Sequence, residues 1–173
     1  MKRSFARSLL ILLFVNLAFS HNITEAERKI SQAVESRSYD TALAELLNLR
    51  TNDTAAFIAK DYDYLLARMA ESTGDLALAM ATFREVTARN SPLKPYALKH
   101  LSQIARSTGN LLLERIYLNE IQMFAPDSLA AKGAVYRLAR NSFECGNYGE
   151  TISILGTVPQ DPKKTAATST DRE

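Results

Sequence analysis

The chain has 173 residues, of which 46% are hydrophobic, and it carries 21 basic and 19 acidic side chains. Its length suits one folded domain, and its hydrophobic fraction is ordinary for a globular protein. The formal net charge of +2 excludes the strongly basic composition of general nucleic-acid-binding proteins, so we expect no nucleic-acid partner.

The first 20 residues have the three-part pattern of a secretory signal. Basic residues precede an apolar run from Leu9 to Val15, and small residues follow as far as Ser20. We therefore predict cleavage after Ser20 and an exported protein, periplasmic or extracellular. An N-terminal anchor that stays attached is the alternative. No other stretch approaches the roughly 20 apolar residues of a membrane helix, so we expect no membrane span in the mature chain.

Three short segments repeat along the chain, each a glycine followed by Asp or Asn. The glycines Gly74, Gly109 and Gly146 lie 35 and 37 residues apart, which is a spacing typical of stacked repeats. Apolar residues recur at helical spacing on both sides of each glycine. Glycine commonly ends a helix, and the Asp or Asn after it can cap the next one. The predicted capping residues are Asp75, Asn110 and Asn147. Each repeat is therefore predicted to be a helix, a tight turn and a second helix.

The same periodicity predicts an all-α fold with no sheet. The predicted helices lie near residues 23–36, 39–49, 55–72, 75–89, 94–107, 110–124, 128–144 and 148–156. The predicted organisation is a signal peptide over 1–20, a helical repeat domain over 21–158 and a disordered tail over 159–173.

These repeated segments resemble the tetratricopeptide-repeat family over roughly residues 23–158. The resemblance rests on small residues seven positions before each glycine, on residues five and nine positions after the first glycine, and on one proline. These residues are Ala67, Ser102, Ala139, Ala79, Phe83 and Pro126. The resemblance implies a right-handed superhelix of about four stacked helix-turn-helix repeats. Glu114 and Thr151 depart from the pattern, because the family has alanine there.

Two connecting segments are also similar to the helical repeat regions of bacterial envelope proteins. They are residues 90–93 and 125–131, each of which contains a proline. Such regions include the N-terminal superhelical part of soluble lytic murein transglycosylases. The similarity implies a periplasmic setting and a cell-wall or envelope partner.

Residue types that carry catalysis or bind metals do not form a recognisable motif in this sequence. The two histidines, His21 and His100, have no zinc-ligand spacing around them. The single cysteine, Cys145, cannot form an internal disulfide. We therefore expect a protein that is not an enzyme and that has no metal and no cofactor.

A partner-binding face follows from the resemblance, because the first helix of each pair lines the concave face in the family. Tyrosines and cations recur there, and arginine can bind carboxylates through two hydrogen bonds. The predicted partner-binding residues are Tyr64, Arg68, Tyr96, Lys99, Gln103, Arg106, Tyr136 and Arg140. The alternative is that they are ordinary solvated or inter-helix residues, since charge on helix faces is common.

Two functions are consistent with this sequence. The first is an exported scaffold that binds a protein or peptide partner, with acidic side chains or a free carboxylate, in its concave groove. The alternative is a non-catalytic module that binds or regulates the cell wall (peptidoglycan) and is related to the repeat domains of lytic transglycosylases. Pull-down of a polypeptide favours the first, and binding to purified peptidoglycan favours the second.

Overall fold

A computed structural model describes residues 25–158 of the chain. Within these residues all regular structure is helical, which confirms the predicted all-α class. None of the helices in this part of the chain is both long and apolar enough to cross a membrane. The predicted signal peptide (1–20) and the predicted disordered tail (159–173) lie outside the described residues.

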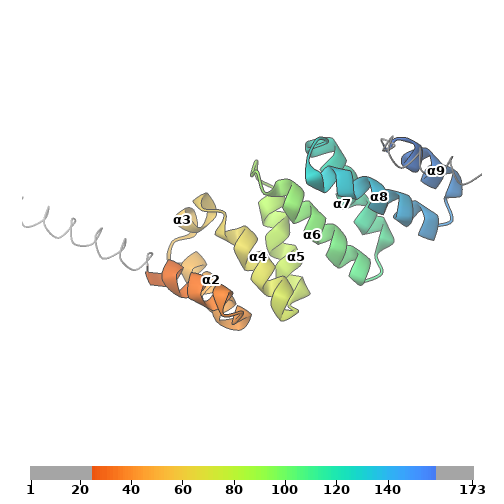
Figure 1. The fold of residues 1–173 in the computed structure, drawn as a ribbon. Coiled ribbons are helices and arrows are strands. Elements are labelled where there is room, and N and C mark those ends of the chain that lie inside the picture. Colours follow the sequence, from red (N-terminus) through yellow and green to blue (C-terminus); the bar gives the residue numbers. More distant parts are fainter. Residues whose placement is uncertain (1–24, 159–173) are drawn as a thin grey trace, which may run out of the picture. The chain divides into compact units, whose positions relative to one another are not determined.

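The chain divides into two compact units, and the boundary falls after Val86. Figure 1 shows the helices of each unit in chain order. The first unit begins with helical residues 25–35. It continues with α2 (Tyr39–Asn52), α3 (Thr54–Ala59), α4 (Tyr62–Thr73) and α5 (Leu76–Thr87). The second unit holds α6 (Lys94–Ser107), α7 (Leu111–Phe124), α8 (Leu129–Glu144) and α9 (Tyr148–Gly156).

The core of the first unit is apolar. It joins side chains from the first helical segment, α2, α3 and α4, because each of these amphipathic helices turns its apolar face toward the others. The buried members are Ile30, Ala33, Ala42, Leu46, Leu49, Phe57, Leu66 and Met69. Helix α5 packs on α4 through an edge-to-face contact between Tyr64 and Phe83, whose ring centroids lie 5.7 Å apart.

The predicted helix over 55–72 is wrong, because the structure divides it into α3 and α4. Asp61 has a φ of +54°, a left-handed conformation that stops a helix and that Asp tolerates better than most residues. Asp53 caps α3 by accepting a hydrogen bond from the backbone nitrogen of Ala56 at 3.0 Å. Phe57 of α3 is buried in the core, and α4 begins at Tyr62 after the interruption.

The glycine turns lie where the sequence predicts them. Gly74, Gly109 and Gly146 have φ values of +85°, +75° and +79°, which glycine adopts at low cost. The turn after α6 is closed by a hydrogen bond from the Asn110 backbone nitrogen to the Ala105 carbonyl at 2.8 Å. Each of these turns reverses the chain, so that the helices on either side of it run antiparallel.

Two of the three predicted helix caps are confirmed. The side chain of Asn110 accepts from the Leu113 nitrogen at 2.9 Å. Asp75 accepts from the Leu78 nitrogen at 3.0 Å. Asn147 occupies the cap position of α9 but makes no side-chain capping hydrogen bond.

In the second unit each helix packs on the next, and α6 also contacts α8 directly. Apolar side chains such as Leu98, Leu101 and Ile121 are fully buried there. The same unit also buries polar side chains, the largest of which are Glu114 and Asn141. Helices α6 and α8, with α7 packed against them, position the candidate site.

Candidate functional site

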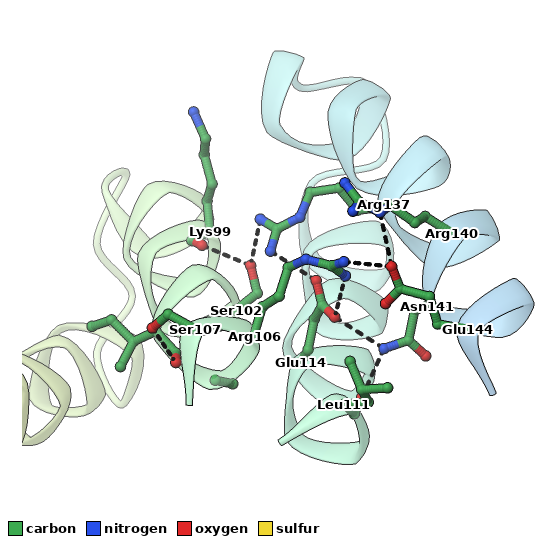
Figure 2. A network of polar contacts seen from close by, with 12 residues as sticks. Lys99, Ser102, Arg106, Ser107, Leu111, Glu114, Arg137, Arg140, Asn141 and Glu144 are labelled. Atoms are coloured by element: carbon green, nitrogen blue, oxygen red, sulfur yellow. Dashed lines mark hydrogen bonds and ion pairs between the residues drawn. The ribbon is translucent and has the colours of Figure 1, made fainter. Parts of the chain in front are cut away.

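The candidate site is built around a buried carboxylate, Glu114 of α7, which has no solvent exposure. Its Oε2 accepts from Arg106 Nη1 of α6 at 3.2 Å and from Asn141 Nδ2 of α8 at 3.0 Å. Its Oε1 accepts from Arg137 Nη2 of α8 at 2.9 Å. Figure 2 shows Glu114 between these side chains. A buried charge is tolerated only when it is paired and hydrogen-bonded, and this one is both.

The network continues outward to Glu144, at the C-terminal end of α8. Its Oε1 accepts from Arg106 Nη2 at 2.6 Å and from Arg140 Nε at 2.9 Å. The hydrogen bond from Arg106, followed by that from Arg140, holds the pKa of Glu144 below its usual value. Arg106 in turn has its pKa raised, chiefly by its bond to Glu144. The guanidinium of Arg106 therefore bridges a buried and an exposed carboxylate.

Arg137 is the second guanidinium fixed by this network. Besides Glu114, it donates from Nη1 to the hydroxyl of Ser102 at 3.0 Å, and Ser102 donates to the Lys99 carbonyl at 2.6 Å. Ser102 is one of the small residues seven positions before a glycine, so its hydroxyl lies where α6 and α8 approach closely. Arg137 thus links these two helices.

An open pocket lies against this network, and we call it the arginine pocket. It has a volume of about 490 Å³ and is lined by Gln103, Arg106, Ser107, Arg137 and Arg140. Three guanidinium groups and two carboxylates meet around it, which leaves one net positive charge. The side chain of Arg140 is 67% exposed, and within residues 25–158 its terminal nitrogens donate to no protein group. They can therefore donate to an incoming anion.

A second pocket, of about 330 Å³, adjoins the first, because the two share Gln103 and Arg137. We call it the apolar pocket, since most of its lining is hydrophobic. Its other lining residues are Tyr96, Lys99, Leu118, Ile121, Leu129, Ala130, Gly133 and Ala134. The two pockets lie next to each other along α6 and α8, and we refer to them together as the α6/α8 groove.

The structure brings together five of the eight residues predicted to bind a partner. Tyr96, Lys99 and Gln103 line the apolar pocket, and Gln103, Arg106 and Arg140 line the arginine pocket. Tyr136 lies on α8, where it is 58% exposed, but it lines neither pocket.

The other two predicted residues, Tyr64 and Arg68, belong to the first unit and are not part of this groove. Tyr64 packs against Phe83, and Arg68 Nε lies 3.4 Å from a carboxylate oxygen of Glu71. Both side chains therefore make contacts within their own unit.

The sequence prediction missed Arg137, which lies in both pockets. A signal was present, because Glu114 occupies a position where the repeat pattern has a small buried residue. A carboxylate at such a position needs cationic partners from neighbouring helices. The spacing alone did not show which arginine supplies them.

A separate polar cluster lies between α7, α8 and α9. Arg115 donates to Glu150 and to Ser142, and Ser142 donates to Glu150 at 2.9 Å. The hydrogen bond from Arg115, followed by that from Ser142, lowers the pKa of Glu150. None of these residues lines the α6/α8 groove, so the cluster offers matched control positions.

Within residues 25–158, no group of three His, Cys, Asp or Glu side chains could hold a metal ion. No protein-family model matches the chain, and no curated protein matches it.

Proposed function

We propose that this protein is a non-catalytic binding module that holds a segment of another polypeptide in the α6/α8 groove. The observation that carries the proposal is the junction of the two pockets, which share Gln103 and Arg137. One pocket offers apolar surface and the other offers guanidinium groups. A peptide with an apolar side chain close to an acidic one matches both.

The electrostatics of the arginine pocket favour a carboxylate as the acidic group. Arg106 and Arg137 are held in place by the buried Glu114, so they lose little freedom on binding. Arg140 supplies exposed donors beside them. A charge-assisted hydrogen bond to such a group contributes about 1.5–3 kcal/mol.

We propose that the helices form tetratricopeptide-like repeats, stacked as a right-handed superhelix in which α6 and α8 line the inner face. The support is the recurrence of a helix, a left-handed glycine and a second helix at Gly74, Gly109 and Gly146. The packing of α6 on α8 also fits two successive first helices. A crystal structure in which successive helix pairs fail to stack in this sense would reject the repeat family.

We propose that the chain is exported to the periplasm or the extracellular space. The support is the basic, apolar and small-residue pattern of residues 1–20. N-terminal sequencing of the exported protein should begin at His21. An intact Met1 on that protein would contradict cleavage.

The binding proposal is tested by peptide selection against the purified protein. Random peptides displayed on phage should be enriched for an acidic residue within a few positions of an apolar one. The same selection against Arg140→Glu should lose the acidic preference. Sedimentation with purified peptidoglycan tests the alternative function, a cell-wall module. Binding to peptidoglycan without enrichment of any peptide would support that alternative and contradict the peptide proposal.

A further inference from the structure

Glu144 stands at the rim of the arginine pocket without lining it. Its side chain is 30% exposed, and both of its arginine contacts fall on one oxygen. Within residues 25–158 its second oxygen accepts no hydrogen bond. Glu144 therefore neutralises part of the pocket while remaining open to the solvent.

The charge around the pocket depends on this residue. Arg106, Arg137 and Arg140 bring three positive charges, and Glu114 and Glu144 bring two negative ones. One carboxylate from a ligand balances the remaining charge. A phosphate group brings about −1.5 to −2 at neutral pH, so Glu144 repels it more strongly than it repels a carboxylate.

The two carboxylates of the network have different roles. Glu114 is fully buried and ties α6 to α8 through α7, so its loss disturbs the fold. In the part of the chain that the structure describes, Glu144 is bonded only to arginines that line the pocket, and Gln at this position keeps an oxygen that can accept from them. The charge of Glu144 can therefore be removed on its own.

We infer that Glu144 is a specificity-determining residue, which makes the arginine pocket accept a singly charged carboxylate in preference to a doubly charged phosphate. The inference rests on the proposed function, since it assigns the ligand chemistry of the same groove. Glu144 acts on this selectivity through its charge, because it contacts the arginines of the pocket and not the ligand.

The test uses two fluorescein-labelled peptides with the selected acidic and apolar pattern. They differ only at the acidic position, which is glutamate in one and phosphoserine in the other. Fluorescence anisotropy gives both dissociation constants for the wild type, Glu144→Gln, Glu144→Ser and Glu144→Asp. The wild type should prefer the glutamate peptide. The two neutral variants should shift the ratio of the constants toward phosphoserine by about tenfold, because one repulsive charge a few ångström away is removed.

Glu144→Asp keeps the charge and should keep the wild-type ratio. The matched control is Glu150→Gln, which removes a similarly paired carboxylate outside the groove and should also leave the ratio unchanged. Circular dichroism establishes which neutral variant is folded, and either one suffices.

An unchanged ratio in a folded neutral variant overturns the inference, and so does an equal loss of both affinities, which would mean that Glu144 only positions Arg106 and Arg140. If Glu144 fails this test but Arg140→Glu abolishes peptide binding, the proposed function stands without the inference. If the wild type binds neither peptide, both are overturned.

Discussion

The two units differ at one position of the sequence repeat, where the first has an alanine and the second has a glutamate. Ala79 lies five residues after Gly74, and Glu114 lies five residues after Gly109. Both are fully buried. In the first unit the buried side chain is small and apolar, whereas in the second unit it is a carboxylate held by arginines from two other helices.

The difference shows that the departure from the repeat pattern at Glu114 coincides with the candidate site. Alanine at this position has no polar group that could bind an arginine. Glu114 also fixes Arg106 and Arg137 beside an open pocket, so the structural network and the candidate site are the same group of residues. Three residues before its glycine the first unit has Glu71 where the second has Arg106, so the first unit lacks that cation.

The largest effect is expected when the first unit receives the side chain of the second. Ala79→Glu should destabilise the fold by about 4 kcal/mol or more, because it places a carboxylate at a fully buried position that holds an alanine in the wild type. Urea unfolding followed by circular dichroism measures the loss. Ala55→Glu, an exposed position in α3, should change stability by less than about 0.5 kcal/mol. Equal effects of the two substitutions would remove the distinction between the units.

The converse change should cost slightly less. Glu114→Ala leaves Arg106 and Arg137 without their buried partner, and these side chains remain 26% and 25% exposed, so water can partly replace it. We expect a loss of about 3 kcal/mol in the free energy of unfolding. Glu150→Ala, which removes the exposed carboxylate paired with Arg115, should cost much less in the same urea titration, because solvent screens an exposed ion pair. A Glu114→Ala protein as stable as the wild type would mean that the network does not hold the second unit together.

Two glycines within the second unit should respond in opposite directions. Gly109→Val should cost more than about 1 kcal/mol, because a β-branched residue resists a φ of +75°. Gly133 lies inside α8, and an added Cβ there meets nothing within 4 Å. Gly133→Ala should therefore raise stability by about 0.5–1 kcal/mol. Thermal melts of both variants check the sign, and destabilisation by Gly133→Ala would contradict the open space around that residue.

The smallest expected effect is a loss of stability at acidic pH. Glu144 and Glu150 in the second unit, and Glu27 in the first, have pKa values below the usual glutamate value, each chiefly because of a hydrogen bond from a basic side chain. A lowered folded-state pKa means that the folded protein binds fewer protons than the unfolded chain. The resulting stability is present above the unfolded-state pKa of about 4.3 and is lost as the pH falls through the folded-state values.

The urea midpoint should therefore stay level from pH 7 to about 5 and decline below that. The double variant Glu144→Gln with Glu150→Gln should flatten this decline more than Glu27→Gln does, because the second unit holds two of the three groups. An acid decline that both variants leave unchanged would assign the titration to other carboxylates.

Helix positions and turns were predictable from the sequence, because apolar period and glycine placement are local signals. The turns at Gly74, Gly109 and Gly146 are confirmed. The division between α3 and α4 was not predicted, since the apolar period runs through Asp61 and only the backbone conformation of that residue interrupts the helix.

The candidate site was predictable in part. The resemblance implied that the first helix of each pair lines the concave face, so Lys99 and Arg106 of α6 were selected, and both line a pocket in the structure. Arg137 was missed because its role depends on a long-range contact with Glu114 of another helix. Tyr136, its neighbour in sequence, was selected instead and lines neither pocket.

The central claim is that the arginines of the α6/α8 groove bind an acidic segment, and Arg140 tests it most directly. Arg106 and Arg137 also bond the buried Glu114, whereas among residues 25–158 Arg140 pairs with the exposed Glu144 alone. Anisotropy titration of the selected glutamate peptide should give a dissociation constant at least about tenfold weaker for Arg140→Glu than for the wild type. Lys132→Glu, an equal charge change at an exposed position of α8 outside both pockets, should bind as the wild type does. Equal affinity of Arg140→Glu and the wild type would contradict the account and place the ligand elsewhere on the chain.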